Sequence, residues 1–264
     1  MTLPVTITCA PCCWGVDDVS NPHLPHWECV LDEAAEAGFG GLELGPYGYM
    51  PLDVARVGAA LEARGIRILA GTIFDDLVRP QNRENLLRQV NEICALITAL
   101  PRPETHPRQR FAAPCLTVID WGHDERDYAA GHSGRAPRLE AWNGMVANIR
   151  AIAELARDRY GVRAVIHPHA GGYVEFEDEL DRVAQDVPGE VAGLCRDSGH
   201  IDHSGTDPIA ALLRYAPAPN ISTSRTSTTR NTPMSWGAIS GSSTPCAEGV
   251  IVRQPSPRRR LDAG

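Results

Sequence analysis

Apolar residues in this chain follow two alternating patterns. Short continuous runs, typical of buried strands, alternate with longer segments that carry an apolar residue every third or fourth position, typical of one helical face. The segment 26–37 shows the helical spacing between Trp27 and Ala35, and Gly38 favours a helix end. The predicted strands cover 5–10, 41–44, 67–74, 115–119, 163–166 and 191–195, and the predicted helices cover 26–37, 53–64, 84–100, 139–160 and 207–215, with one further helix between the last two strands.

This order of elements predicts an α/β fold with a parallel sheet. Strands that alternate with helices of 10 or more residues indicate repeated β-then-α units, and such units place their strands side by side in parallel. The natural parent is an eight-fold α/β barrel. About six units are recognisable, so we expect an incomplete barrel domain over residues 1–217.

The composition changes after Pro217. Ser and Thr together number 14 in the 47 residues from Ala218 to Gly264, against 12 in the preceding 217. The same stretch is rich in Pro and Arg and lacks periodic apolar positions, which is typical of irregular or disordered chain. We therefore expect 218–264 to form an irregular tail.

The charge balance narrows the classes of partner. A formal net charge of -8 argues against a surface that binds nucleic acid or an anionic membrane, and it suits an enzyme that acts on small molecules. A homo-oligomer is compatible with this charge. All 25 basic residues are arginine, which excludes chemistry on a lysine amine. Eight scattered cysteines, with no leader segment and no bilayer-length apolar run, favour a cytoplasmic protein with reduced thiols.

Two predicted strands end at residues that can bind a metal or move a proton. His167 and His169 follow the fifth strand, and Asp197 and His200 follow the sixth. In a parallel α/β fold the carboxyl ends of the strands are where functional residues gather. Both histidines can face that end only if Pro168 bends the chain. Asp197 precedes Ser-Gly, a turn that would bring its carboxylate and His200 into one space; the alternative is an Asx-turn with a solvated histidine.

For the other candidate site residues, a purely structural role is about as well supported as a functional one. Glu43 lies within the second strand, as a catalytic group or a salt-bridged barrel acid. Trp14 and Tyr47 would floor a sugar-binding pocket or simply pack. Asp120 and His123 follow the fourth strand, where they belong either to the site or to loop surface.

Several of these segments resemble one family. Residues 32–39, 42–49, 69–74 and 167–171, and more specifically Asp197-Ser-Gly-His200, are similar to the sugar phosphate isomerase/epimerase superfamily of xylose-isomerase-like TIM barrels. Within it the inosose dehydratase-like branch is the most similar. The resemblance covers residues 5–217. It implies a (β/α)8 TIM barrel, here truncated, and a metal-dependent lyase or isomerase of sugar or inositol metabolism. An inosose dehydratase-like activity is the first expectation; a keto-sugar or sugar-phosphate isomerase/epimerase, or an inactive truncated product, are the alternatives.

The resemblance also assigns roles. It implies a divalent cation, Mn2+ or Co2+ first and Mg2+ or Zn2+ as further options, at the carboxyl ends of the strands. Asp197 matches the metal ligand on strand six, and His200 matches a histidine that binds metal or substrate. The family's strand-five glutamate is His167 here, so the donor from this strand is open among His167, which also stands as a substrate contact, His169 and Glu175. The expected catalytic residues are His169, His200 and Glu43.

The family's strand-seven and strand-eight motifs are absent from this chain. Codons for residues 220–228 can be chosen so that dropping two bases yields His-Leu-His-Leu-Lys-Asp-Ile-Asp, the missing strand-seven motif. We therefore hypothesise a frameshift near Pro217 that replaced the end of a barrel. The coding DNA across residues 215–229 tests this directly, because codons incompatible with the second frame would end the hypothesis.

Overall fold

The computed structural model describes residues 7–105, 111–124, 126 and 137–215. These residues all fall within the first of two compact units, which spans Met1–Arg225. The expected irregular tail at 218–264 lies outside the described residues, so its conformation stays a prediction.

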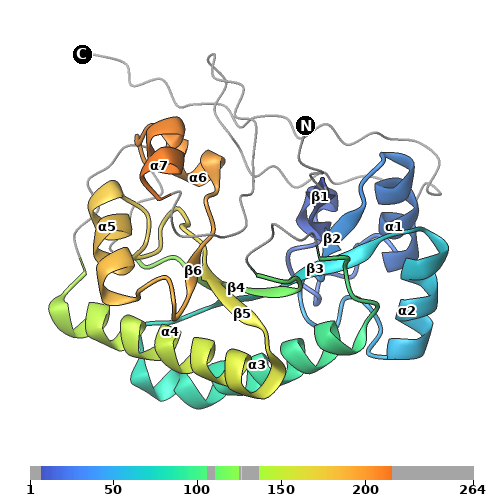
Figure 1. The fold of residues 1–264 in the computed structure, drawn as a ribbon, viewed down its shortest axis with the longest axis horizontal. Helices are drawn as coiled ribbons and strands as arrows, with labels where there is room; N and C mark the ends of the chain where they lie inside the picture. Colours follow the sequence, from blue (N-terminus) through green and yellow to red (C-terminus); the bar gives the residue numbers. More distant parts are fainter. Residues whose placement is uncertain (1–6, 106–110, 125, 127–136, 216–264) are drawn as a thin grey trace. The chain divides into compact units, whose positions relative to one another are not determined.

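The described chain builds one six-stranded parallel sheet (Figure 1). Its strands pair in sequence order, each with the next. Sequential order is that of an α/β barrel, whereas a doubly wound sheet reverses its order part-way. The strands are β1 (Thr8–Cys9), β2 (Gly41–Glu43), β3 (Arg67–Asp75), β4 (Cys115–Asp120), β5 (Arg163–Ile166) and β6 (Gly193–Leu194). The predicted six parallel strands of an α/β barrel are therefore confirmed in the described residues, and the boundary of the domain at residue 217 stays a prediction.

The described part also contains seven α-helices and two short 3-10 helices; five of the α-helices lie between consecutive strands and two follow the last strand. The caps explain several boundaries: Asp53 accepts a hydrogen bond from the Arg56 amide at the start of α2, and left-handed Gly161 ends α4. The helices are α1 (Trp27–Glu36), α2 (Val54–Ala63), α3 (Arg83–Ala99), α4 (Leu139–Tyr160), α5 (Glu177–Asp186), α6 (Ser198–His203) and α7 (Pro208–Arg214), with η1 (Pro11–Trp14) and η2 (Pro80–Asn82). Among these described helices, none has the length and apolarity needed to cross a membrane.

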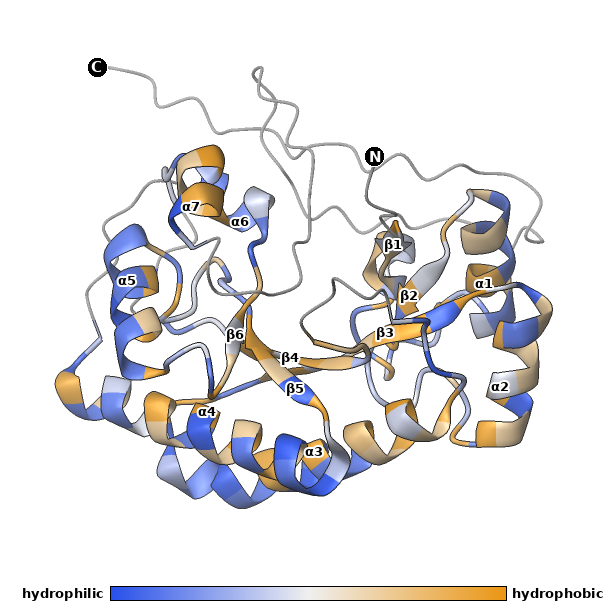
Figure 2. Cartoon of the chain, viewed as in Figure 1, coloured by the Kyte–Doolittle hydropathy of each residue, from blue (hydrophilic) through white to orange (hydrophobic). Residues whose placement is uncertain are grey.

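The main core lies between the sheet and its helices. Figure 2 shows the strands as largely hydrophobic, whereas α3 and α4 carry both hydrophobic and hydrophilic residues along their length. Alternate residues of β4 serve the two faces: Leu116 and Val118 join the main core, whereas Cys115 joins a small inner cluster with Val165 and Cys195. A parallel strand that is apolar on both faces is thus buried on both, as in a barrel.

Helix α4 is clamped to the loop that follows β3. The Asn148 amide donates hydrogen bonds to the Leu77 and Arg79 carbonyls, at 2.8 and 3.3 Å. One turn earlier, Gly144 lies so close to this loop that an added Cβ would stand 2.4 Å from the Val78 carbonyl oxygen. The packing of α4 therefore fixes the loop at the carboxyl end of β3.

Replacing Gly144 with alanine should destabilise the protein by about 1–3 kcal/mol, because the methyl group forces α4 away from backbone that cannot yield cheaply. Urea unfolding would measure the loss. Gly58→Ala is the matched control, since its new Cβ would make only ordinary contact, 3.4 Å from Pro101, within helix α2; we expect it to be neutral or stabilising by up to ~1 kcal/mol. Equal effects of the two substitutions would contradict the clamp.

The carboxylate of Asp75, the last residue of β3, is held by neutral groups. One oxygen accepts hydrogen bonds from the Asp76 backbone amide and the Asn82 side chain, and the other accepts from Asn85 and Gln89. Three of these donors are side-chain amides of η2 and α3. They bind the start of α3 to the end of β3.

Candidate functional site

The carboxyl ends of β5 and β6 bring His167 and Asp197 together. The His167 amide continues the ladder by donating to the Val118 carbonyl, and the Asp197 carboxylate caps α6 by accepting from the Gly199 and His200 amides through Oδ1. The other carboxylate oxygen, Oδ2, lies 3.3 Å from His167 Nε2. Both side chains are buried. The predicted turn after Asp197 is instead the short helix α6, and the capping bonds fix the carboxylate in place.

His169 and His200 lie beside this pair. Their ring centroids are 4.3 Å apart, and those of His167 and His200 are 5.4 Å apart. Strand β5 ends at Ile166, before Pro168, so the alternation of a strand no longer separates His167 from His169. The structure therefore gathers His167, His169, Asp197 and His200 in one place.

Hydrogen bonds from one turn set the proton positions on two of the rings. His200 Nδ1 accepts from the Ala170 amide at 3.2 Å, so the neutral ring carries its proton on Nε2. His169 Nδ1 lies 2.9 Å from the Ala170 carbonyl, which can only accept, so this ring carries its proton on Nδ1. The two neighbouring imidazoles thus present opposite tautomers.

The pair of Asp197 and His167 fits two ligands of one cation. Ligands bound at ~2.0–2.2 Å and roughly at right or tetrahedral angles lie about 3–3.5 Å apart, whereas a charged hydrogen bond is usually ~2.7–2.9 Å. The observed separation is 3.3 Å. His167 Nδ1 is also buried without a hydrogen-bond partner among the described residues. Within the ranges that the structure describes, no group of three or more His, Cys, Asp or Glu side chains is arranged to hold a metal ion.

Glu175, the third candidate donor of this strand, is hydrogen-bonded to the loop after His169. Its carboxylate accepts a hydrogen bond from the Gly171 amide at 3.0 Å and lies near Arg126. Arg126 itself forms a buried ion pair with Glu179, at the start of α5. The structure therefore places Glu175 in the support of the loop after His169.

Glu43, Trp14 and Tyr47 lie at the β1–β2 end of the sheet. Glu43 is the last residue of β2, and its carboxylate lies 3.5 Å from the Thr72 hydroxyl. The Trp14 indole donates to Glu33 at 2.6 Å, and Tyr47 is half-buried against the core. Substrate contact by Trp14 and Tyr47, and catalysis by Glu43, stay predictions.

One feature of the site was not predicted, and the role of one further residue was left open. Phe74, near the end of β3, is 53% exposed and its ring centroid lies 5.3 Å from that of His169. Successive residues of a strand point to opposite faces, so a buried Ile73 implies that Phe74 points to the other face. The position of Phe74 in the predicted strand 67–74 was the available signal. Asp120, left open between site and surface, is buried, and its carboxylate lies 2.8 Å from His123 Nε2.

Burial raises the pKa of Glu175 and of Glu179, although the Gly171 amide favours the charged form of the first and Arg126 that of both. A carboxyl whose folded pKa exceeds its unfolded value stabilises the fold most below the unfolded pKa, and this contribution falls as pH rises through the folded pKa. Glu175→Gln keeps an acceptor for Gly171 but removes the titration. We therefore expect the wild type to gain stability relative to this variant between about pH 7.5 and about pH 5, in urea unfolding.

The control for this prediction is Glu154→Gln, at an exposed position of α4. Its stability difference from the wild type should not change over the same interval. A wild type that loses stability relative to Glu175→Gln on acidification would contradict the predicted sign.

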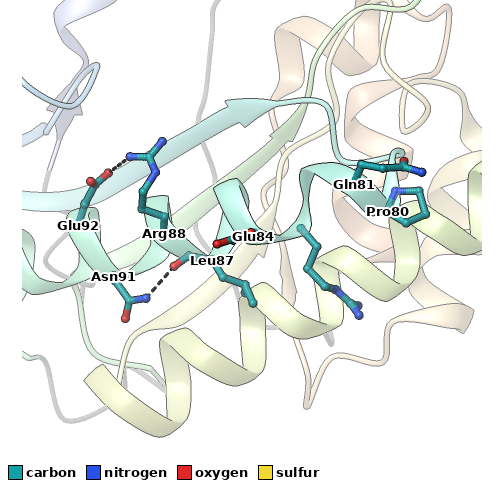
Figure 3. Close-up of a pocket in the computed structure, with 8 residues that line it drawn as sticks. Pro80, Gln81, Glu84, Leu87, Arg88, Asn91 and Glu92 are labelled. Atoms are coloured by element: carbon teal, nitrogen blue, oxygen red, sulfur yellow. Dashed lines mark hydrogen bonds and ion pairs between the residues drawn. The ribbon is translucent and has the colours of Figure 1, made fainter.

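A separate hollow of ≈ 760 Å³ lies on the outside of η2 and α3 (Figure 3). Arg88 and Glu92 form an ion pair across one side, with Nη1 and Oε2 2.7 Å apart, and Asn91 donates to the Leu87 carbonyl of its own helix. The hollow does not include the histidine cluster. The ion pair of Arg88 with Glu92 and the hydrogen bond from Asn91 to Leu87 lie within helix α3, and we assign the hollow no chemistry.

Known proteins resemble the chain in sequence and fold. It is 29% identical over 220 residues to the rhizopine catabolism protein MocC of Rhizobium meliloti, covering 81% of this chain and 62% of that protein. It is 27% identical over 219 residues to inosose dehydratase of Clostridium beijerinckii, covering 81% and 68%. The chain thus spans less than two thirds of the length of MocC.

Solved structures share the fold at lower identity. A xylose isomerase-like TIM barrel protein from Mycobacterium smegmatis, solved in complex with magnesium, matches with a TM-score of 0.62 at 16% identity, over 82% of this chain and 73% of that one. The family described as the xylose isomerase-like TIM barrel matches residues 31–252. Because this match covers most of the sequence, and the described part has the sequential parallel sheet of such a barrel, the chain belongs to the xylose isomerase-like TIM barrel family.

Proposed function

We propose that the chain carries the site of a metal-dependent lyase that dehydrates an inosose, a keto-inositol. The observation that carries this proposal is the cluster of Asp197, His167, His169 and His200 at the carboxyl ends of β5 and β6. The similarity to inosose dehydratase of Clostridium beijerinckii supports the substrate class.

Asp197 Oδ2 and His167 Nε2 would hold a divalent cation, as two of its ligands. A cation held there would polarise the ketone oxygen and the neighbouring hydroxyl of the substrate, and so lower the pKa of the C–H bond between them. The magnesium complex of the Mycobacterium smegmatis protein supports a divalent metal, whose identity among Mn2+, Co2+, Mg2+ and Zn2+ is a matter for titration.

The two remaining histidines then have complementary tasks. His169 holds its proton on Nδ1, so Nε2 is the atom that would accept the substrate proton. His200 holds its proton on Nε2 and would deliver it to the departing hydroxyl. Phe74 offers the apolar surface beside His169 against which the C–H face of a sugar ring can pack.

The alternative, an isomerase or epimerase of keto-sugars or sugar phosphates, is supported less well by this arrangement. An epimerase removes a proton from one face of a carbon and delivers one to the other face, so it needs acid/base groups on opposite sides. The ring centroids of His169, in the loop after β5, and His200, in helix α6, lie 4.3 Å apart. Such a pair suits removal of a proton and a hydroxyl from the same side.

Incubation of the purified chain with inosose and each cation in turn tests the proposal. We expect the absorbance of the enolised 1,2-dione, the product of losing one water, to rise with Mn2+ or Co2+. Interconversion of keto-sugars without formation of this dione would favour the epimerase. Absence of turnover on both, together with absence of cation binding, would leave the chain as an inactive product of such a gene.

A further inference from the structure

Asp120 joins three loops at the carboxyl ends of the strands. Its Oδ1 accepts a hydrogen bond from the Leu77 amide after β3, at 3.3 Å, and its Oδ2 accepts from the Tyr173 amide after β5, at 2.9 Å. Oδ2 also lies 2.8 Å from His123 Nε2, in the loop after β4. Asp120 is 4% exposed, so these bonds replace solvent around a buried carboxylate.

His123 bonds to Asp120 at the end of β4 and makes two contacts with the loop that bears His169. Because Asp120 accepts, His123 Nε2 carries the proton of their shared hydrogen bond. The ring of His123 stacks on Tyr173, with centroids 4.0 Å apart and planes 15° from parallel. Its backbone amide donates to the Gly171 carbonyl at 2.9 Å.

The turn after His169 fits closely against β4. The Gly172 amide donates to the His169 carbonyl, and the His169 amide donates to the Val174 carbonyl, which closes the turn. A Cβ at Gly172 would stand 2.7 Å from the Asp120 carbonyl oxygen. The turn is therefore held against the end of β4 by packing as well as by hydrogen bonds.

The same turn sets the tautomers of His169 and His200. Ala170 supplies both the carbonyl that faces His169 Nδ1 and the amide that donates to His200 Nδ1. Any tilt of the turn would change both contacts together.

We propose that Asp120 and His123 are a positioning pair, which holds the turn at Ala170 so that His169 and His200 keep opposite tautomers. Neither residue has a role in the proposed chemistry itself; they act through His169 and His200. The inference deepens the proposed function and rests on it.

Two substitutions separate the hydrogen bond from the stacking. His123→Phe keeps a ring on Tyr173 but removes the donor to Asp120, whereas His123→Gln keeps a donor near the position of Nε2 and removes the ring. Long-range proton–nitrogen NMR of the imidazoles reads the tautomers, with signals assigned by His169→Gln and His200→Gln. His26→Phe is the matched control, because His26 caps α1, far along the chain from this turn.

In the wild type we expect a single Nδ1–H pattern for His169 and a single Nε2–H pattern for His200. His123→Phe should replace both by averaged patterns, and His123→Gln and His26→Phe should retain them. If inosose is turned over, kcat should fall ~10–100-fold in His123→Phe with little change in KM, the usual cost of losing a group that orients a catalytic side chain. If His123→Phe does not fold, Asp120→Asn is used in its place, and we expect the same averaged tautomer patterns and the same fall in kcat.

Wild-type tautomers in folded His123→Phe, or in Asp120→Asn where it replaces that variant, would overturn the proposal. Averaged tautomer patterns in His123→Gln, equal to those in His123→Phe, would also overturn the proposal. The hydrogen bond to Asp120 would then not be what positions the turn. Absence of inosose turnover in the wild type would refute the proposed function alone, since the NMR patterns do not depend on substrate.

Discussion

Replacing Asp197 with asparagine should weaken the binding of Mn2+ by at least ~100-fold, because loss of a direct ligand should exceed the ~10–100-fold cost of losing an outer partner. Asparagine is as good an N-cap as aspartate, so the bonds to the Gly199 and His200 amides survive. The substitution therefore removes the negative charge opposite His167 while it preserves α6. Titration with Mn2+, followed by the electron paramagnetic resonance of the unbound ion, would measure the change.

Asp207→Asn is the matched control for this substitution. Asp207 caps α7 by accepting from the Ile209 amide, as Asp197 caps α6, but it is exposed and is no part of the histidine cluster. We expect this variant to bind Mn2+ like the wild type. Equal affinity of the wild type and Asp197→Asn, or no binding by either, would contradict the proposed metal site.

The largest loss of stability is expected for Trp142→Ala, at about 3–5 kcal/mol, because it empties a fully buried site between α4 and α5. The indole of Trp142 donates to Asp186 at 2.7 Å, and the Arg182 guanidinium lies 4.2 Å from the ring centre. Trp142→Phe, which keeps most of the ring but loses the indole N–H, should cost less. Urea unfolding would measure both.

Trp121→Ala serves as the control, since Trp121 is 40% exposed. We expect its effect to stay within about 1 kcal/mol. A loss from Trp142→Ala no larger than that from Trp121→Ala would show that α4 does not depend on this contact.

The long elements were predictable because each carries its own local signals. Helix α4 spans Leu139–Tyr160, as predicted, since its apolar positions repeat over six turns and Gly161 ends it in the left-handed conformation. Helix α6 was missed for the opposite reason. Its six residues are too few to show a helical period of apolar positions. The helix begins where the Asp197 side chain caps the amides of Gly199 and His200.

The site was predictable only as far as strand order determines it. Neighbouring parallel strands end at the same edge, so His167 and Asp197 had to lie close together once β5 and β6 paired. The hydrogen bond of Glu175 depends instead on a turn with Gly171 at φ 83°, and its electrostatic surroundings depend on Arg126, which lies in another loop. Contacts of that kind arise from the packing of segments far apart in sequence, which no local pattern records.

The donors that bind the Asp75 carboxylate are all neutral amides, which implies that different parts of this molecule respond differently to ionic strength. Dissolved salt screens attraction between exposed charges, such as Arg214 with Glu177 where α7 meets α5. The bonds that join Asn82, Asn85 and Gln89 to Asp75 include no cation whose charge salt could screen. Raising the salt concentration should therefore loosen α7 well before it loosens the junction of β3 and α3.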